Sequence, residues 1–234
     1  MTNVKLLEFP NLEKLSIAAV EYFVDLHKPP NKQTFLVPGG QTPKLFYKLL
    51  ARTVDDWSGT TLLLSDERLV PQGNAMSNAG MVKKQIINNF NAVTPPNIIE
   101  FVNRSRFIDP EQILKSVNNY AKTLFPLTAA FLGIGADGHT ASLFPGFEQC
   151  FYNHPDSFIK VNKSNEPFSR ISISANVLID TPQIFFLVSG SDKKAVMKKI
   201  LKKPAEMDTL PVQNILNKSN GKFVFLCDSE ALAF

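Results

Sequence analysis

Segments with the pattern of β-strands alternate with segments with the pattern of helices along most of this chain, and this alternation limits the folds open to it. Helix patterns occur at 11–27, 43–53, 77–90 and 110–125, and apolar strand patterns occur at 32–37, 61–65, 97–102, 128–134, 183–190 and 222–228. Residues 170–176 alternate as a half-buried strand does. Repeated strand–helix units predict an α/β fold, with a mostly parallel sheet and helices on both of its faces.

The length and composition predict that these units form one domain. The chain has 234 residues, of which 44% are hydrophobic, enough for a substantial core. No internal repeat, low-complexity tract or long linker divides it, so the predicted domain spans residues 1–234. The longest poorly patterned region is 148–169, which we expect to form a lid or an extended surface loop rather than a domain boundary.

The charge balance favours a small anionic ligand over a polyanion. There are 25 basic and 21 acidic residues, giving a net charge of +4. The densest basic run, 192–203, has helical spacing, and we interpret most of it as the solvated face of a helix. No cluster of Lys and Arg is dense enough for a nucleic-acid groove, so we expect no nucleic-acid partner.

Cysteine usage and hydropathy set further expectations. Cys150 and Cys227 supply neither a disulfide framework nor a metal cluster. The N-terminus lacks the pattern of a signal peptide, and no run of eighteen apolar residues predicts a membrane span. We therefore expect a soluble, cytoplasmic protein with no bound metal, and a monomer rather than an oligomer.

The glycine-rich stretch after the 128–134 strand carries the most informative residues. Gly133, Gly135 and Gly138 match the spacing G-x-G-x-x-G of a dinucleotide-binding turn. A dinucleotide site would also need an acidic residue at the end of a second strand about twenty residues further on, and the region there is not strand-like. The pattern thus predicts no nucleotide cofactor, and leaves Asp137 and His139 to be explained.

A histidine in this position can accept a proton at cellular pH. We predict that His139 projects from the start of a short helix at 139–144, at the mouth of the sheet, and that Asp137 orients its ring or positions a water. The alternative is a purely local role, with His139 as a helix-start residue and Asp137 as a cap.

Two other strand ends carry polar residues where ligands bind in open α/β sheets. In the loop 38–43, Gly39 and Gly40 permit a tight turn and Thr42 can cap the next helix, so free N–H groups there can bind an anion. An ordinary glycine turn is the alternative. The segment 65–71 places Asp66, Glu67 and Arg68 after the second strand, either as site residues or as a solvated turn. Lys193 at a helix start and Arg170 at a strand start would each, alone, be read as surface charges.

Taken together these segments resemble the 6-phosphogluconolactonase family. The match is carried by "GIGADGHTASLFPG", "PGGQTP", "SDERLVP", "SNAGM", "RISIS", "GSDK" and the final "CD", and runs from about residue 8 to the end. The resemblance implies the Rossmann-like fold shared with glucosamine-6-phosphate deaminases. It also implies hydrolysis of 6-phospho-D-glucono-1,5-lactone to 6-phospho-D-gluconate, the second step of the oxidative pentose phosphate pathway, without metal or nucleotide.

The resemblance also implies roles for individual residues. The phosphate-side loop corresponds to Gly39, Gly40, Gln41 and Thr42, with Arg170 and Lys193 as its basic partners. Asp66, Glu67 and Arg68 correspond to the segment lining the cleft, and Asp137 and His139 to the catalytic loop, where the histidine is the general base. Arg68 or the backbone N–H groups of 137–140 would stabilise the carbonyl oxygen.

The chain departs from the family pattern at three places. Pro38 and Gln41 stand where serines are usual, Ala121 follows Tyr120 where the family often has Glu, and the strand beginning at 127 lacks an initial aspartate. None of these positions is in the Asp-Gly-His or Asp-Glu-Arg segments.

Two other functions compete with lactone hydrolysis. A sugar-phosphate deaminase or isomerase of the same fold would need a carboxylate soon after the Asp-Gly-His segment, where this chain has "TASLFPG". A non-catalytic sugar-phosphate sensor would usually carry a DNA-binding module, for which we see no room. A Ser/His/Asp hydrolase is disfavoured because no G-x-S-x-G turn is present.

Overall fold

The computed structural model describes residues 3–71, 73–92, 94–102, 109–146, 154–164, 166–202 and 210–234. Its main sheet has seven strands in the order β1-β10-β9-β6-β2-β3-β5, and every neighbouring pair is parallel. The strands are β1 (Val4–Phe9), β2 (Gln33–Val37), β3 (Thr60–Leu64), β5 (Asn97–Ile99), β6 (Ala129–Gly133), β9 (Gln183–Val188) and β10 (Lys222–Asp228). The predicted parallel sheet is confirmed.

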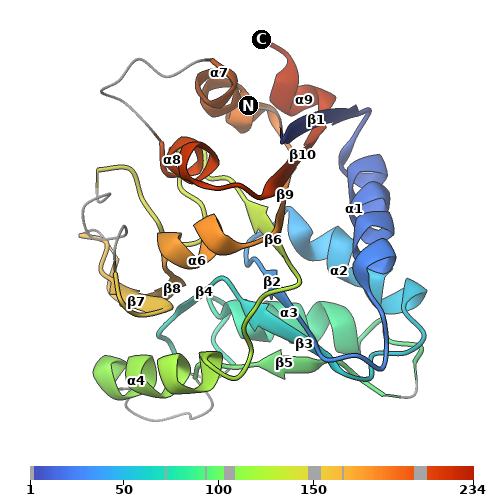
Figure 1. Ribbon diagram of the computed structural model, residues 1–234. Coiled ribbons are helices and arrows are strands. Elements are labelled where there is room, and N and C mark those ends of the chain that lie inside the picture. The colour runs from blue at the N-terminus through green and yellow to red at the C-terminus, as the bar shows by residue number, and fades with distance from the viewer. Residues whose placement is uncertain are drawn as a thin grey trace.

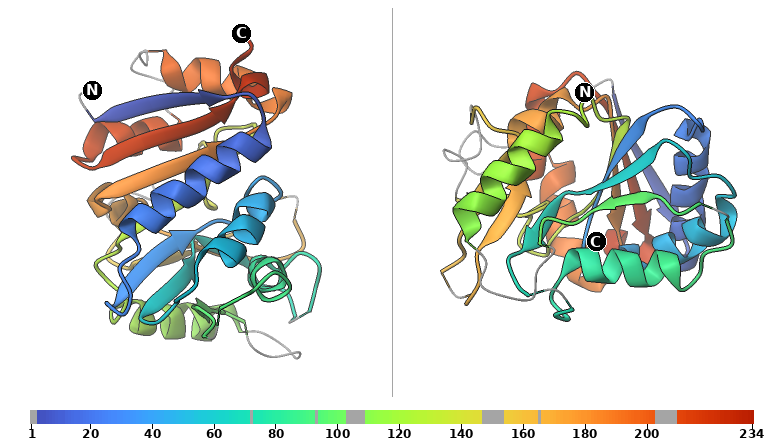
Figure 2. Two further views of the ribbon diagram at one scale, coloured as in Figure 1. Left: turned by 90° about the vertical axis from the view of Figure 1, so that its right-hand side faces the viewer. Right: turned by 90° about the horizontal axis from the view of Figure 1, so that it is seen from below.

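Helices cover both faces of this sheet, as predicted (Figures 1 and 2). On one side α1 (Leu12–Leu26) packs against α2 (Pro43–Thr53), which in turn packs against α3 (Asn78–Ile87). On the other side lie α6 (Ala175–Asp180) and α8 (Pro211–Lys218). The remaining helices among the described residues are α4 (Pro110–Ala121), the short 3₁₀ turn η1 (Ser191–Lys193), α7 (Lys194–Leu201) and α9 (Ser229–Leu232).

Stacked aromatic rings join α1 and α2 to the sheet. Phe131 of β6 stacks on Phe46 of α2 at 5.1 Å between ring centres and on Phe185 of β9 at 4.8 Å. Phe23 of α1 contacts the same cluster and is fully buried. Burying one such ring stabilises the fold by about 1.5–3 kcal/mol. Because Phe46 belongs to α2, its stacking on β6 holds α2 against the sheet and so positions the loop before this helix.

A smaller antiparallel sheet lies beside the main one. It consists of β4 (Asp66–Arg68), β8 (Arg170–Ile173) and β7 (Phe158–Val161), in the order β4-β8-β7. The predicted strand at 170–176 ends at Ile173, since Ala175 already begins α6. It belongs to this smaller sheet and not to the main one. The predicted loop at 148–169 contains β7, although 147–153 and 165 lie outside the described residues.

Other differences from the sequence prediction have local causes. The edge strand β1 was not predicted, because its burial alternates irregularly and only one neighbour pairs with it. The helices α6, α8 and α9 were not predicted either, because they have only six, eight and four residues, fewer than helical periodicity needs to be read from a sequence. The strand predicted at 97–102 ends at Ile99. None of these differences changes the order of the central strands.

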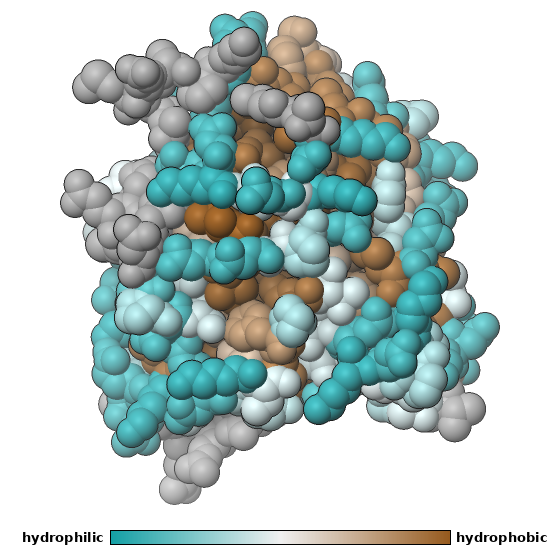
Figure 3. Space-filling view, in the orientation of Figure 1, coloured by the Kyte–Doolittle hydropathy of each residue, from teal (hydrophilic) through white to brown (hydrophobic). Residues whose placement is uncertain are grey.

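The order of strands reverses between β2 and β6. From β2 the chain proceeds outward through β3 to β5, whereas β6 pairs with the other side of β2 and leads to β9 and β10. The loops after β2 and β6 therefore run in opposite directions and leave a crevice between them. Open α/β sheets bind their ligands at such a reversal. On the face shown in Figure 3, hydrophilic side chains run across apolar areas in the middle of the molecule.

Candidate active site

A pocket of about 200 Å³ lies at the point where the strand order reverses. Its lining comes from the loop 38–43 after β2, from Ser65, Asp66 and Arg68, from Asn78 of α3, from 133–135, His139 and Ala141 after β6, from Arg170 of β8 and from Lys193 of η1. Of the eleven residues predicted for the site, all except Asp137 and Glu67 line this pocket. The structure therefore brings together segments that are far apart in the sequence.

His139 is held by Asp137. The carboxylate of Asp137 lies 2.5 Å from Nδ1 of His139, and the same Oδ1 accepts the backbone N–H of His139 at 3.2 Å. Burial raises the pKa of Asp137, but the charge and hydrogen bonds of His139 outweigh it and the pKa is lowered. An ionised carboxylate only accepts hydrogen bonds, so in the neutral ring Nδ1 carries the hydrogen and Nε2 has a free lone pair.

Gly135 makes room for this imidazole. A Cβ at Gly135 would lie 2.1 Å from Nδ1 of His139 and 2.6 Å from Oδ1 of Asp137. The two residues can therefore pair only because position 135 has no side chain. This contact, rather than a nucleotide cradle, explains one glycine of the G-x-G-x-x-G pattern.

The prediction of a short helix at 139–144 is wrong. Residues 140 to 143 form a tight turn closed by a bridge between Thr140 and Leu143. Gly138 has φ +90° and Ala141 has φ +51°, and such left-handed conformations interrupt a helix. Ala141 lines the pocket, so the strained backbone lies at the site itself.

The loop 38–43 forms the opposite wall. Gly40 has φ +93°, and a Cβ at Gly39 would overlap the side chain of Asn78. The phenol of Tyr47, buried in α2, donates a 2.5 Å hydrogen bond to the carbonyl of Pro38 and anchors the loop from below. The prediction that Thr42 caps α2 is wrong, because Thr42 is helical and makes no side-chain cap. The N-terminus of α2 thus faces the pocket without a side-chain cap, a favourable place for an anion.

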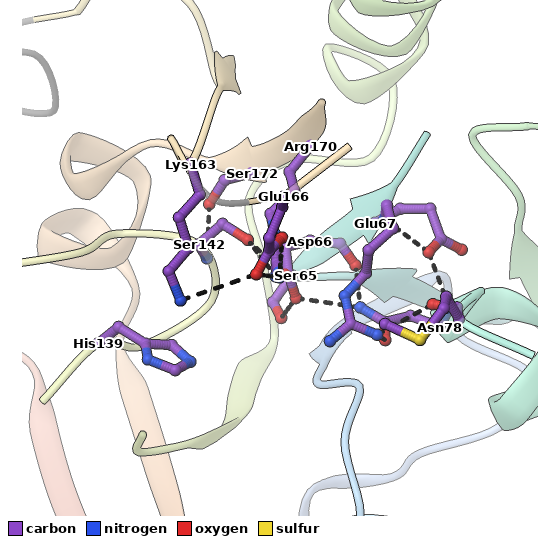
Figure 4. A network of polar contacts seen from close by, with 12 residues as sticks. Ser65, Asp66, Glu67, Asn78, His139, Ser142, Lys163, Glu166, Arg170 and Ser172 are labelled. Atoms are coloured by element: carbon purple, nitrogen blue, oxygen red, sulfur yellow. Dashed lines mark hydrogen bonds and ion pairs between the residues drawn. The ribbon is translucent and has the colours of Figure 1, made fainter. Parts of the chain in front are cut away.

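Asp66 is the centre of a buried polar network (Figure 4). Its Oδ2 accepts a 2.5 Å hydrogen bond from the hydroxyl of Ser142, and its Oδ1 lies 3.3 Å from both Ser65 Oγ and Asn78 Nδ2. Asp66 is only 6% exposed. The network joins β4, α3 and the turn after β6, and it fixes the floor of the pocket.

Glu67 points away from the pocket toward the start of α3. Its carboxylate accepts hydrogen bonds from the backbone N–H groups of Asn78 and Ala79 at 2.7 and 2.8 Å and from the hydroxyl of Ser77 at 3.0 Å. Burial raises the pKa of Glu67, and these hydrogen bonds oppose the rise. In this structure Glu67 holds the helix that carries Asn78.

Arg68 is oriented by the same helix. Its Nη1 donates to the carbonyl of Met76 at 2.9 Å and to Oδ1 of Asn78 at 3.0 Å. Its Nε is buried and has no hydrogen-bond partner among the described residues. Its Nη2 is not buried and makes no hydrogen bond to another described residue, so this nitrogen is the donor left for a ligand.

Lys193 reaches the pocket from a loop that Asp228 holds. Asp228, at the end of β10, accepts a 2.5 Å hydrogen bond from the hydroxyl of Ser189 and a 3.1 Å bond from the backbone N–H of Gly190. Gly190 has φ +101°, and η1 begins directly after it. Lys193 is paired with Asp192 at 2.9 Å. Asp228 is 4% exposed and lies outside the pocket.

Several residues of the site were not predicted individually. Asn78, Ser65 and Ala141 line the pocket, while Ser142 and Asp228 position others from behind. Asn78 and Asp228 stand in the quoted segments "SNAGM" and "CD", but nothing local distinguishes them from ordinary caps. Among the residues that the structure describes, no three His, Cys, Asp or Glu side chains form a group that could hold a metal ion. No helix in that part of the chain is long and apolar enough to cross a bilayer.

Comparisons with known proteins show what this chain is similar to. The chain is 30% identical over 232 residues to the 6-phosphogluconolactonase of Caulobacter vibrioides, covering 94% of this chain and 96% of that protein. It is 29% identical over 219 residues to that of Helicobacter pylori strain J99, covering 91% and 93%.

Solved structures show the same fold. A structure titled as the devB protein has a TM-score of 0.85 at 25% identity, covering 98% of both chains. The 6-phosphogluconolactonase of Trypanosoma brucei has a TM-score of 0.82 at 21% identity, covering 98% of this chain and 97% of that one. The profile of the family described as "Glucosamine-6-phosphate isomerases/6-phosphogluconolactonase" matches residues 12–225. The chain therefore belongs to the glucosamine-6-phosphate isomerase/6-phosphogluconolactonase family.

Proposed function

We propose that this protein hydrolyses 6-phospho-D-glucono-1,5-lactone to 6-phospho-D-gluconate, with His139 as the general base. The observation that carries the proposal is the placement of one imidazole, paired with Asp137 through Nδ1, in the same pocket as Arg170, Lys193 and a helix N-terminus. The first group suits activation of a water, and the others suit a phosphate. The relatives named above as 6-phosphogluconolactonases support the choice of substrate.

In this mechanism Nε2 of His139 takes a proton from a water as the water attacks C1 of the lactone. The imidazolium, stabilised by Asp137, then gives a proton to the leaving ring oxygen. A δ-lactone is an activated ester, so a covalent intermediate is not required. General base catalysis of this kind contributes roughly 10²- to 10⁴-fold in rate.

Arg68 is the better candidate for stabilising the negative charge on the carbonyl oxygen. The other candidates are backbone N–H groups of 137–140, of which that of Gly138 is bonded to the carbonyl of Gly135 and that of His139 to Asp137. Arg68 lines the pocket and carries a full charge, and its Nη2 makes no hydrogen bond to another described residue. A donor aimed at the developing charge is worth about 2.7–4 kcal/mol in comparable sites.

The phosphate would lie between the loop 39–42, Lys193 and Arg170. The N-terminus of α2 supplies N–H groups and a favourable dipole. Lys193 and Arg170 supply charge from the other side of the pocket. Held at this end, the substrate brings its lactone toward His139, and binding energy from the unreacting phosphate contributes to catalysis.

A deaminase on the same fold is the second candidate. A monomeric glucosamine-6-phosphate deaminase has a TM-score of 0.79 to this chain at 19% identity, which concerns the fold alone. Against that activity, no carboxylate occurs from Thr140 to Gly146. The pocket carboxylate nearest to this turn is Asp66, which is buried among four hydrogen-bonding or charged partners.

The test is an assay with freshly generated 6-phosphogluconolactone, corrected for spontaneous hydrolysis, in the presence of EDTA. Glucosamine 6-phosphate is assayed in parallel for release of ammonia. We expect turnover of the lactone only, and we expect EDTA to leave the rate unchanged, since the proposal includes no metal or nucleotide cofactor. The proposal further includes a monomeric state and a cytoplasmic location. Calorimetric binding of the sugar phosphate without turnover would instead indicate a sensor. Ammonia release would indicate the deaminase.

A further inference from the structure

Arg170 is held more firmly than Lys193, the other basic residue predicted to bind the phosphate. It begins β8 and is only 6% exposed. Its guanidinium carbon lies 5.6 Å from the ring centre of Phe144 and 5.7 Å from that of Phe168. Contacts with aromatic faces at these distances are favourable for a guanidinium and restrict its movement.

Glu166 holds one edge of this guanidinium. Its Oε2 accepts from Nε of Arg170 at 2.9 Å, and its two oxygens accept from Nη2 at 2.8 and 2.6 Å. Such a bidentate pair sets the plane and rotation of the group, not only its charge. Lys163 lies 3.7 Å from the other side of the same carboxylate and 4.8 Å from the Phe144 ring centre, and both cations converge on Glu166 (Figure 4).

The remaining nitrogen, Nη1, lies on the side of Asp66, which lines the pocket together with Arg170. It is 3.4 Å from Oγ of Ser142 and 3.7 Å from Oδ2 of Asp66, so neither contact is a strong hydrogen bond. Asp66 lines the pocket, whereas Glu166 does not. The Glu166 carboxylate thus binds Nε and Nη2 of Arg170 from outside the pocket and leaves Nη1 for a ligand.

We propose that Glu166 is a positioning residue for phosphate recognition, which fixes Arg170 so that its Nη1 is presented to the phosphate of the substrate. This inference rests on the proposed function, because it assigns the anion bound at Arg170. Preorganisation of this kind raises affinity by removing the cost of ordering a long side chain when the ligand binds.

Two observations support a positioning role over competition with the substrate. A competing carboxylate would lie in the pocket and occupy Nη1 of Arg170, and Glu166 does neither. Partial burial raises the pKa of Glu166, but hydrogen bonding and charge from Arg170 outweigh it and the pKa is lowered, so the carboxylate stays ionised at neutral pH. The bidentate pair is therefore present under assay conditions.

The substitution Glu166→Gln tests the proposal. It keeps the size of the side chain but replaces one acceptor by an amide that cannot accept from Arg170. We expect KM for the phosphorylated lactone to rise roughly tenfold, as when a partner behind a ligand-binding group is lost, with kcat changed less than about twofold. Hydrolysis of unphosphorylated gluconolactone should be unchanged. Glu166→Asp, which keeps the charge on a shorter stem, should restore part of the affinity.

Glu111→Gln is the matched control, because Glu111 is a surface carboxylate paired with Lys160 outside the pocket. Binding of inorganic phosphate, measured by calorimetry, supplies a readout independent of turnover, and should weaken in Glu166→Gln but not in Glu111→Gln. If the wild-type protein binds phosphate in a Glu166-dependent way but hydrolyses no lactone, the proposed function fails and this inference stands. A lower KM, unchanged phosphate binding, or an equal loss with both lactones would overturn it.

Discussion

The carboxylate of Asp137 lies 2.5 Å from Nδ1 of His139, and this contact decides which ring nitrogen is available for chemistry. Because the carboxylate is an acceptor, the hydrogen of the neutral ring stays on Nδ1. Nε2 is then the basic atom. Without Asp137 the ring could rotate or change tautomer, and the same histidine would lose its orientation.

The first prediction concerns His139 itself. His139→Asn keeps some hydrogen bonding but cannot take a proton from water, so kcat should fall by roughly 10²- to 10⁴-fold with KM nearly unchanged. In the wild type, the rate should fall at acid pH because a protonated imidazole is not a base, and this acid limb should vanish in the variant. The measurement is the rate against pH after subtraction of spontaneous hydrolysis. Near wild-type turnover would move the search for the base to Asp66 and Asp137, since Glu67 points away from the pocket.

The second prediction uses the space at Gly135. Gly135→Ala would place a methyl group 2.1 Å from the His139 ring and should lower kcat nearly as much as His139→Asn, because the imidazole must move. Gly80→Ala is the control: it lies in α3, its Cβ would have ordinary contacts at 3.5 Å, and it should stabilise the fold by about 0.5–1 kcal/mol without changing the rate. Full activity in Gly135→Ala would show that catalysis does not require the observed geometry of the Asp137–His139 pair.

The third prediction concerns the cations of the pocket. Lys193→Ala should raise KM strongly and reduce the preference for phosphorylated lactone over gluconolactone, because a phosphate-binding charge is lost. Arg170→Ala should do the same. Lys199→Ala, an exposed position on α7, serves as the control and should have no effect. If the preference survives in both Lys193→Ala and Arg170→Ala, the phosphate binds elsewhere.

The fourth prediction follows from the hydrogen bonds behind Lys193. Asp228→Asn removes the charge that holds Ser189 and Gly190, so the loop should loosen. We expect KM for the phosphorylated lactone to rise several-fold. The charge-assisted contact between Lys193 and the phosphate would be weakened, which costs about 1 kcal/mol of binding free energy. Ser189→Ala should have a smaller effect in the same direction. A fall in kcat with KM unaltered would contradict this role for Asp228.

The fifth prediction concerns stability and pH. His27 is buried, and its Nε2 lies 2.7 Å from the hydroxyl of Thr60. Desolvation lowers the pKa of His27 below its ordinary value. Below about pH 6.5 the unfolded chain therefore binds a proton that the folded protein resists, and the free energy of unfolding should decrease as the pH falls.

Denaturant unfolding between pH 8 and pH 5 tests this. The stability advantage of the wild type over His27→Gln should be largest above the unfolded-state pKa and should shrink at lower pH. His154→Gln, which alters an exposed loop contact, is the control. A difference between wild type and His27→Gln that does not vary with pH would contradict the prediction.

Much of the fold and most of the site residues could be predicted because their signals are local. An apolar run followed by a glycine turn and a helix predicts a parallel strand and places the following residues at its carboxyl end. That reasoning placed Gly39, Arg68 and His139 at one edge, whereas the role of Lys193 came from the family resemblance, and the structure brings all four into one pocket. The helix predicted at 139–144 failed because a positive φ at Ala141 has no local sequence signal.

What the sequence by itself determined is thus the alternation of strands and helices and the chemistry available after each strand. Only the tertiary structure decided which of those groups act together. Ser142 and Asp66 are 76 positions apart, and Ser189 and Asp228 are 39 apart, yet each pair is hydrogen bonded. The placement of Arg170 in a second sheet likewise depends on pairing with β4. Local periodicity cannot specify such contacts, because they arise from how separate elements pack and not from the residues next to them in the chain.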